Sequence, residues 1–279
     1  MKNTEINKII DPIPATDGAG VKLKRSIGVE PNYYDPFLML DEFGSENKDD
    51  YIAGFPPHPH RGIETVTYML SGDFEHKDST GGKGIMTAGD VQWMKTGSGI
   101  IHSEMPAMKE GKLHGFQLWI NMPASKKMSK PEYHYINADQ MSVFKDDEKF
   151  VKVIAGKFKN SEGPIKGHNI EPIYFDIVLE KNKEFNYELP STHNSFIYLI
   201  DGEIKIGKQK HDKVKNSKLI LLTNGEKLVV LGLSKAKFLL ISGKPIGDKI
   251  ARGGPFVMNT KAEVLQAVQD YHNGTFVKK

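Results

Sequence analysis

Turn-forming dipeptides interrupt this sequence at short and regular intervals. They include Ser71-Gly72, Gly89-Asp90 and Asp201-Gly202, and the runs between them, such as Thr65–Leu70 and Phe196–Ile200, are rich in β-branched and aromatic residues. Short runs of this kind, bounded by frequent turn signals, favour antiparallel sandwiches or barrels over alternating helices and strands. We therefore predict an all-β fold.

Helix signals are few. The clearest covers Lys261–His272, where apolar side chains recur at helical spacing. Thr260 and Glu263 have the spacing of a capping box, in which each side chain accepts a hydrogen bond from the backbone N–H of the other residue. We predict a short C-terminal helix here and a second short helix at Ala138–Val143.

The two halves of the 279-residue chain share a weak internal repeat. Tyr68–Asp73 matches Tyr198–Glu203 at an offset of 130 positions, and Gly89-Asp90 matches Gly225-Glu226 at an offset of 136. Two copies of one all-β unit would account for a length beyond that of a typical single domain. The predicted domains are residues 1–136 and 150–279, with a polar linker at 137–149.

The complete absence of cysteine narrows the chemistry that the chain can perform. It rules out disulfides, zinc fingers, thiolate-bound iron–sulfur clusters and cysteine nucleophiles. Any metal must therefore be held by nitrogen and oxygen ligands from His, Asp or Glu.

The charge balance is nearly even, with 38 Lys+Arg against 35 Asp+Glu. Arg25, Arg61 and Arg252 are the arginines of the chain, so the other cations are lysines. Because arginine supplies most bidentate contacts to bases and phosphates, we do not expect specific nucleic-acid binding. We see no secretory signal, and the apolar runs are far shorter than the ~20 residues of a membrane span, so we expect a cytoplasmic protein with no membrane partner.

The segment Phe55–Glu64, FPPHPHRGIE, is the most informative in the chain. His58 and His60 share one face of an extended segment because side chains alternate along a strand. The prolines around them disfavour a helix and stiffen the backbone. Glu64 keeps the same parity if the strand continues, so it is either a further candidate ligand or an ion-pair partner of Arg61 or a lysine.

A second cluster follows in the segment Gly97–Glu104, GSGIIHSE. His102 and Glu104 share a face by the same alternation. Together with His58 and His60 they form a set of three imidazoles and a carboxylate, which suits divalent iron, manganese, nickel, copper or zinc. The sequence therefore predicts a metal site whose open coordination positions would serve substrate or O₂.

The internal repeat does not preserve these side chains, so we expect a metal site in the first domain only. At the two offsets, the positions matched to His58, His60, His102 and Glu104 are Glu188, Pro190, Phe238 and Leu240.

These residues resemble the two motifs of the cupin family. His58-x-His60-x₃-Glu64 resembles the first motif, and Gly97-x-Gly99-x₂-His102 resembles the second, with Gly97 where cupins usually have proline. The closer resemblance is to the pirin family, whose proteins contain two cupin domains. The segments that carry it lie in order across nearly the whole chain: Asp35–Phe43, Phe55–Gly72, Gly89–Pro106, His114–Asn121 and Gly254–Thr260.

The pirin resemblance implies two cupin barrels (double-stranded β-helices, or jelly rolls) packed face to face, with a metal in the first barrel only. The three histidines and one glutamate that bind metal in the family match His58, His60, His102 and Glu104 here. The resemblance also implies that Glu104, rather than Glu64, is the carboxylate ligand. Glu64 then becomes a candidate for orienting an imidazole.

Two further residues are expected near this site. Pro57 stands where the resemblance leads us to expect an acidic residue, which would alter the surroundings or the mouth of the site without removing a ligand. His114 is expected on a strand near the site, where it is structural or contacts a ligating side chain or the substrate.

The resemblance implies a metal-dependent dioxygenase of the quercetin 2,3-dioxygenase type, which cleaves the ring of a flavonol with O₂. Fe(II) is the expected metal, with Mn, Ni, Cu or Zn as alternatives, and Glu104 is the expected general base for the flavonol hydroxyl. The alternative is a non-enzymatic regulatory protein in which a redox-active metal alters the binding of a protein partner.

Overall fold

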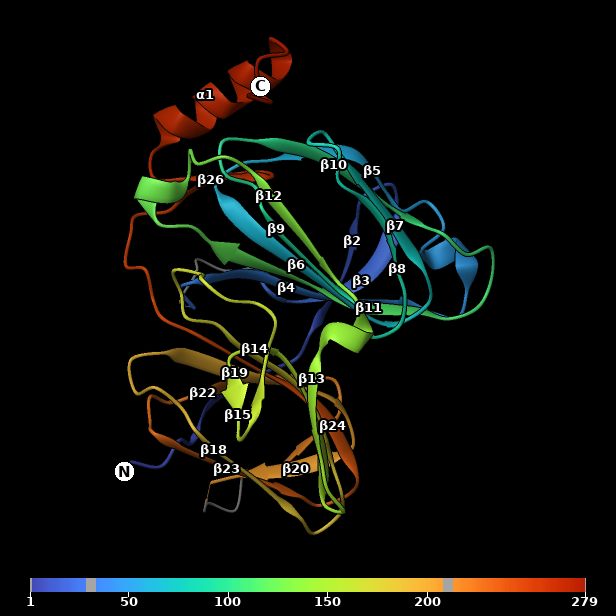
Figure 1. Cartoon of the computed structure of the whole chain (residues 1–279), viewed down its shortest axis with the longest axis vertical. Coiled ribbons are helices and arrows are strands. Elements are labelled where there is room, and N and C mark those ends of the chain that lie inside the picture. Colours follow the sequence, from blue (N-terminus) through green and yellow to red (C-terminus); the bar gives the residue numbers. More distant parts are fainter. Residues whose placement is uncertain (1, 29–33, 208–212, 279) are drawn as a thin grey trace. The chain divides into compact units, whose positions relative to one another are not determined.

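The computed structural model of the chain describes residues 2–28, 34–207 and 213–278 (Figure 1). The chain forms two compact units. The N-lobe comprises Ile13–Ala138 and Ile246–Lys279, and the C-lobe comprises Met1–Pro12 and Asp139–Pro245. Strands dominate both units, as predicted, and no helix of the described residues has the length and hydropathy needed to cross a membrane.

The larger sheet of the N-lobe is antiparallel and joins seven strands in the described residues. In its centre, Leu118 lies opposite Leu40 on one neighbouring strand and opposite Val66 on the other, so the register aligns apolar side chains. In spatial order the strands are β12 (Glu132–Ile136), β9 (Val91–Lys95), β6 (Ile63–Ser71), β11 (Leu113–Asn121), β4 (Phe37–Ser45), β3 (Val21–Ile27) and β2 (Ile13–Asp17).

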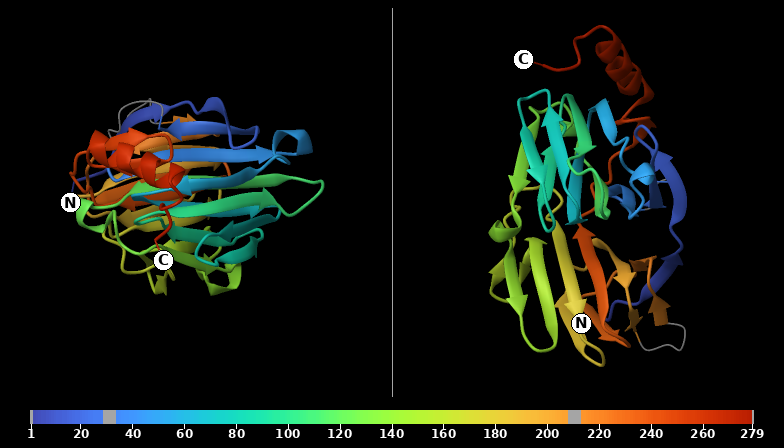
Figure 2. Two further views of the ribbon diagram at one scale, coloured as in Figure 1. Left: turned by 90° about the horizontal axis from the view of Figure 1, so that it is seen from above. Right: turned by 90° about the vertical axis from the view of Figure 1, so that its right-hand side faces the viewer.

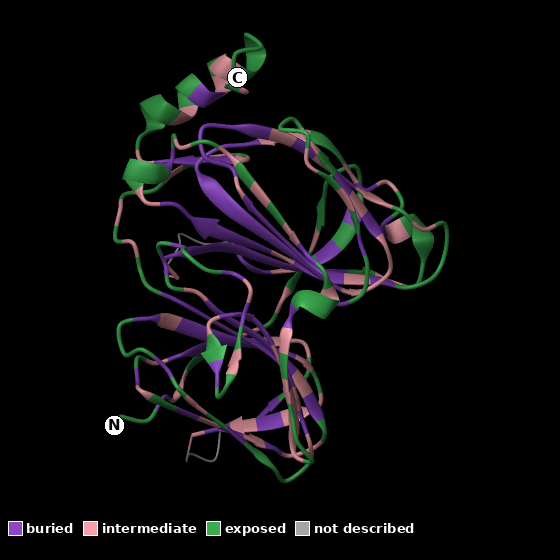
Figure 3. Ribbon diagram, viewed as in Figure 1, coloured by how far each residue is buried: buried purple, intermediate pink, exposed green. Residues whose placement is uncertain are grey.

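The smaller sheet of the N-lobe is formed, in spatial order, by β5 (Phe55–His60), β10 (Ile100–Pro106), β7 (Phe74–Asp78) and β8 (Lys83–Met86). β5 lies at the edge of the sheet, where prolines that cannot donate to the hydrogen-bond ladder are tolerated. Buried apolar residues of both sheets, together with Tyr51 beside them, form one cluster, and Figure 3 colours the ribbon of buried residues purple. The members of this cluster are Val21, Leu23, Phe43, Tyr51, Met69, Phe74, Met86 and Leu113.

The C-terminal segment of the chain completes the N-lobe. It contains β25 (Ala251–Gly253), β26 (Phe256–Met258) and helix α1 (Lys261–His272), and Figure 2 shows it in red. Thr260 Oγ1 accepts a hydrogen bond from the backbone N–H of Glu263, and the Glu263 carboxylate accepts one from the backbone N–H of Thr260. The predicted helix and its capping box are therefore confirmed.

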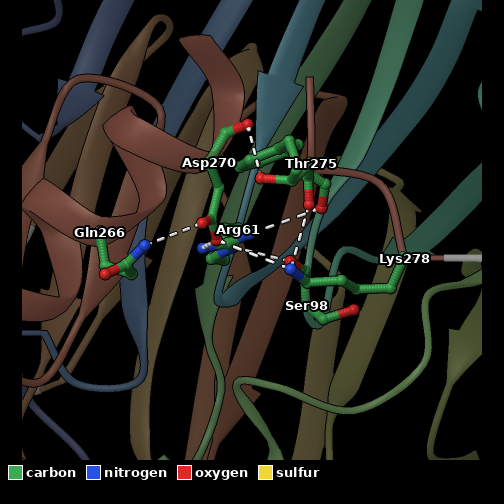
Figure 4. Close-up of polar contacts among 7 residues, drawn as sticks. Arg61, Ser98, Gln266, Asp270, Thr275 and Lys278 are labelled. Carbon is green, nitrogen blue, oxygen red and sulfur yellow. Dashed lines mark hydrogen bonds and ion pairs between the residues drawn. The ribbon is translucent and has the colours of Figure 1, made fainter. Parts of the chain in front are cut away.

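A buried arginine connects this segment to the rest of the N-lobe through an ion pair and hydrogen bonds (Figure 4). Arg61, which follows His60, donates from Nη1 to Asp270 Oδ2 on α1 at 2.8 Å and from Nε to the Ser98 carbonyl at 2.7 Å. Its guanidinium carbon lies 4.5 Å from the centre of the Phe276 ring. The Arg61 side chain is 1% exposed, so its guanidinium has lost its hydration. These partners compensate for that loss.

The C-lobe repeats the strand order of the N-lobe. Its larger sheet contains β1 (Ile6–Ile10), β22 (Lys218–Leu222), β19 (Asn194–Asp201), β24 (Ala236–Gly243), β17 (Ile173–Leu179), β14 (Lys149–Ala155) and β13 (Ser142–Lys145). Its smaller sheet contains β18 (Glu184–Glu188), β23 (Lys227–Gly232), β20 (Glu203–Ile206) and β21 (Lys213–Lys215). The C-lobe also contains the strands β15 (Lys157–Phe158) and β16 (Ser161–Glu162). Among the described residues, the 3₁₀ turns η1 (Lys48–Asp50) and η2 (Ala124–Lys126) belong to the N-lobe, and η3 (Ala138–Gln140) lies at the boundary between the two units.

The shared strand order supports one of the two sequence matches between the halves. β6 and β19, which carry Tyr68 and Tyr198, each take the third position in their sheet. The second match is wrong, because Gly89-Asp90 precedes β9 whereas Gly225-Glu226 precedes β23, the strand that takes the place of β10.

The counterparts of His102 and Glu104 therefore lie on β23. Phe238 and Leu240, the positions matched to them in the sequence, belong to β24, which takes the place of β11. The expectation that the second domain lacks these ligands is unaffected, because β23 reads Lys-Leu-Val-Val-Leu-Gly.

The two ends of the chain make the compact units differ from the expected domains of 1–136 and 150–279. β1 pairs with β22 in the C-lobe, with Ile9 opposite Ile220, while the C-terminal segment joins the N-lobe. The helix predicted at Ala138–Val143 is wrong. A single 3₁₀ turn is followed there by β13, and pairing with β14 outweighs the local helix signal.

Candidate metal centre

The pairing of β5 with β10 brings the three predicted histidines together. His102 lies directly opposite His58, and Ile100 lies opposite His60. The ring centres are 4.3 Å apart for His58 and His102, 4.8 Å for His58 and His60, and 5.0 Å for His60 and His102. One candidate ligand nitrogen from each ring lies within 4.8 Å of the other two, so the geometry is that of a potential metal site.

Hydrogen bonds define which nitrogen of each ring is free. Nδ1 of His58 lies 2.8 Å from the Pro56 carbonyl and Nδ1 of His60 lies 3.3 Å from the Pro255 carbonyl, so in both rings Nδ1 carries the hydrogen and Nε2 keeps its lone pair. Nε2 of His102 is buried and has no hydrogen-bond partner among the described residues. A buried lone pair without a partner is costly, and a metal ion would satisfy it. The residues therefore fit a divalent metal.

Burial keeps two of these rings neutral. Desolvation, reinforced by repulsion from His58, lowers the pKa of His60 to about 3. Desolvation also lowers the pKa of His102 well below its usual value, with further contributions from His58, His60 and His76. Neutral imidazole is the form that binds metals, so neither ring has to release a proton before a metal binds at neutral pH.

Glu104 follows His102 on β10 and is 4% exposed. Its Oε1 accepts a hydrogen bond from the Thr67 hydroxyl at 2.8 Å. Glu104 lies with His76 and His102 in a second potential metal group, which shares His102 with the first group. The four predicted ligands are thus gathered around His102, but they are divided between two overlapping groups.

Glu64 and His114 have partners outside both groups. Glu64 is buried on β6 and accepts a hydrogen bond from the indole N–H of Trp93 at 2.6 Å. Nε2 of His114 lies 2.9 Å from Oε1 of Glu42, and both residues line a separate cavity of about 430 Å³. A role for Glu64 in orienting an imidazole and a contact of His114 with a ligand or the substrate therefore stay predictions.

A cavity of about 610 Å³ lies beside the histidines and is lined by His58, His60 and Glu104. Its size is typical of a small-molecule site. Pro57, where the resemblance led us to expect an acidic residue, lines the same cavity. The aromatic side chains in its wall are Phe43, Phe55, Phe74 and Trp119.

Two arginines line this cavity together with the carboxylates of Asp17 and Asp41. Arg25 is paired with Asp41 at 2.7 Å. The guanidinium carbon of Arg252 lies 5.0 Å from the centre of the Trp119 ring. Arg252 therefore places a cation beside the aromatic wall of the cavity.

Two glycines near the histidines have backbone conformations that other residues rarely adopt. Gly62 has a φ of 80°, and a Cβ atom there would collide with the carbonyl oxygen of Val257 in the C-terminal segment. Gly97 has a φ of 48°, whereas the proline ring fixes φ near roughly −65°. This conformation explains why the proline usual in cupins is absent from this position.

The sequence patterns above do not single out His76, which the structure places in the second group. His76 lies on β7 opposite Glu104 and is fully buried. Its Nε2 lies 2.8 Å from Oδ2 of Asp78. The available signal was the spacing His76-x-Asp78, which puts both side chains on one face of a strand.

Two family models match the chain. The pirin model covers residues 20–120, and the model of the pirin C-terminal cupin domain covers residues 174–277. A pirin-like protein of Caulobacter vibrioides is 42% identical over 272 residues, which span 96% of this chain and 98% of the relative.

Solved structures agree with these matches. A quercetin 2,3-dioxygenase from Acinetobacter baumannii has a TM-score of 0.89 at 28% identity and covers 98% of both chains. A bacterial pirin from Escherichia coli, solved in complex with nickel(II), shares the fold with a TM-score of 0.65 at 22% identity, covering 85% of this chain and 98% of that chain. The fold is therefore a bicupin, with two cupin domains and the C-terminal helix α1. The family models and the extent of identity together show that the chain belongs to the pirin family.

Proposed function

We propose that the N-lobe binds one divalent transition metal through His58, His60, His102 and Glu104, and that the protein is a dioxygenase of the quercetin 2,3-dioxygenase type. The observation that carries this proposal is the convergence of three imidazoles at a cavity large enough for a small aromatic molecule. The likeness to the Acinetobacter baumannii enzyme supports a flavonol as substrate and O₂ as co-substrate.

The donor set of nitrogen and oxygen atoms suits several divalent ions. Fe(II) is the first candidate, and Mn, Ni, Cu and Zn are alternatives. When bound, the metal would supply a Lewis acid for the flavonol oxygens and the redox capacity for reaction with O₂.

Glu104 is the proposed general base. Its carboxylate lies in the cavity wall, where it can accept the proton of the flavonol hydroxyl. The Thr67 hydroxyl lies 2.8 Å from Oε1 of Glu104 and 2.6 Å from Oε1 of Gln117, so it helps to hold the carboxylate in place. A carboxylate held in this way is oriented before the substrate binds.

The cavity walls would bind and orient the flat rings of a flavonol. Phe55, Phe74 and Trp119 offer aromatic surface and exclude water from the site. The guanidinium of Arg252 near Trp119 would favour the deprotonated, anionic form of the substrate.

The test is aerobic quercetin turnover by purified protein, loaded separately with each candidate metal after chelation. Glu104→Gln and His58→Ala are expected to abolish turnover, because each removes a proposed ligand. His134→Gln is the control, since His134 is exposed on β12 and bonds to Glu132. Full activity of the metal-free protein would contradict the proposal. Absence of turnover in every metal-loaded form would favour the regulatory alternative, in which the metal state alters binding of a protein partner.

A further inference from the structure

His76 occupies a fully buried position beside the proposed metal site. It lies on β7, and its ring stacks on Tyr133 with the ring centres 4.5 Å apart and the planes 10° from parallel. One ring nitrogen, Nε2, lies 2.8 Å from Oδ2 of Asp78, and both side chains are 0% exposed. The other, Nδ1, lies 3.5 Å from Nδ1 of His102.

Asp78 is an ionised hydrogen-bond acceptor in this position. Desolvation would raise its pKa, but hydrogen bonds from His76, Thr80 and Gly82 outweigh this effect and lower the pKa to about 2. Oδ1 accepts from the backbone N–H and the hydroxyl of Thr80 at 2.7 and 2.6 Å and from the N–H of Gly82 at 3.1 Å. A carboxylate can only accept, so Nε2 of His76 must carry the hydrogen of the bond to Oδ2.

This assignment determines the hydrogens of the next ring. With its hydrogen on Nε2, facing Asp78, the His76 ring offers a lone pair on Nδ1. Two lone pairs facing one another at 3.5 Å would repel, so Nδ1 of His102 carries the hydrogen that lies between the rings. Nε2 of His102 is then left with its lone pair, and this is the buried atom that has no hydrogen-bond partner among the described residues.

We propose that His76 and Asp78 are positioning residues that fix the tautomer of His102, so that its Nε2 lone pair is directed at the metal. The proposal rests on the metal centre of the proposed function. His58 and His60 bond through Nδ1 to backbone carbonyls, whereas His102 depends on a side-chain relay that substitution can reverse.

Asp78→Asn is the substitution that should reverse the relay. Thr80 and Gly82 donate to Oδ1, so the amide oxygen is expected to stay there and the NH₂ group to face Nε2 of His76. His76 would then accept at Nε2 and carry its hydrogen on Nδ1, which moves the hydrogen of His102 to Nε2. The variant thereby places a hydrogen where the metal should bind.

The first measurement reads the tautomers in the metal-free protein by ¹H–¹⁵N correlation spectra of ¹⁵N-histidine-labelled samples. In the wild type, we expect His102 to be protonated on Nδ1 and His76 on Nε2, and we expect Asp78→Asn to exchange both. A wild-type His102 protonated on Nε2 would overturn the proposal, whatever the variants do.

The second measurement is the dissociation constant for Zn(II), a redox-inert probe. Asp78→Asn is expected to weaken binding about 10- to 100-fold, as is usual when a group that orients a metal-binding histidine is changed. Glu75→Gln is the matched control, because it makes the same carboxylate-to-amide change on the other face of β7, where Glu75 pairs with Lys77. Equal Zn(II) affinity in Asp78→Asn and the wild type would contradict the proposal.

A pair of His76 variants separates hydrogen bonding from packing. The side-chain oxygen of His76→Gln can accept from Nδ1 of His102 and should retain most of the Zn(II) affinity, whereas His76→Leu offers no acceptor and should lose it. Equal losses in both variants would indicate a packing role and overturn the proposal. If the wild type binds no Zn(II), the proposed metal centre fails, while the tautomer spectra still test the relay independently.

Discussion

The N-lobe and the C-lobe share one strand order but fill their barrels with different side chains. In the N-lobe, the smaller sheet presents polar groups, namely His58, His60, His76, His102 and Glu104. In the C-lobe, the strands that take the same places carry the buried apolar residues Phe185, Ile204, Ile206, Leu228 and Val230.

This difference shows that the architecture itself does not require a polar interior. In the C-lobe, Phe158 stacks on Phe185 with ring centres 5.4 Å apart and contributes to one continuous apolar cluster. In the N-lobe, burial of imidazoles and a carboxylate costs free energy that apolar side chains would not. Sites that break the packing rules of their own fold are typically functional, and the C-lobe has the same strand order with an apolar interior.

The largest expected effect is on metal binding in the N-lobe. His102→Ala removes the residue that both potential metal groups share, so the loss of metal affinity should exceed the about 100-fold change seen when an orienting partner is altered. Val230→Ala, on the strand that takes the place of β10 in the C-lobe, is the control and should leave metal affinity unchanged. Isothermal titration with Zn(II) measures both, and comparable losses would remove the distinction between the lobes.

The next largest effect is on the stability of the C-lobe. Phe185→Ala removes a fully buried ring from the apolar cluster and should lower the free energy of unfolding by about 3–5 kcal/mol. Urea unfolding measures the loss, and the folded variant should bind Zn(II) as the wild type does. A folded Phe185→Ala protein that no longer binds metal would show that the site depends on the C-lobe interior.

A smaller effect on the free energy of unfolding is expected where the C-terminal segment contacts the rest of the N-lobe. Asp270→Asn leaves the buried guanidinium of Arg61 without its ion-pair partner and should cost about 1–3 kcal/mol in urea unfolding. Gln266→Ala is the control, because Gln266 contacts the exposed side of Asp270 and should change stability little. Equal losses of stability in the two variants would mean that the ion pair between Arg61 and Asp270 does not stabilise the docking of α1.

The smallest effect is a dependence of the stability of the metal-free protein on pH. The pKa of His60 is about 3 in the folded protein, compared with an ordinary value of 6.5. Below pH 6.5 the His60 ring is therefore protonated in the unfolded chain but stays neutral in the folded protein. The free energy of unfolding should therefore fall with decreasing pH, by about 1 kcal/mol per pH unit from this ring between pH 6 and pH 5.

His60→Gln serves as the control for this dependence. It removes the titrating ring and should flatten the slope by that amount, as measured by urea unfolding at pH 6 and pH 5. An unchanged slope in His60→Gln would show that the ring is accessible to protons in the native state.

The alternation of side chains along strands was sufficient to predict most of the candidate site. Each pair, His58 with His60 and His102 with Glu104, lies on a single strand, so its shared face can be read from local spacing. His76 was missed because its place beside Glu104 depends on the pairing of β7 with β10, and a register between separate strands is not visible in local sequence.

The same limit explains the errors in the fold. The all-β class and α1 follow from local periodicity and capping, which the sequence displays. The exchange of the two chain ends depends on distant contacts, such as Ile9 opposite Ile220 and Arg61 with Asp270. The mistaken match of Gly89-Asp90 to Gly225-Glu226 arose because similar turn dipeptides close many of the hairpins.

The most direct test of the central claim is the metal content of purified protein by elemental analysis after loading with Fe(II) and removal of free ion. We expect one metal per chain in the wild type and none in a variant that combines His58→Ala, His60→Ala and His102→Ala. An equal metal content in that variant would contradict a metal centre in the N-lobe. Absence of bound metal in the wild type would do the same.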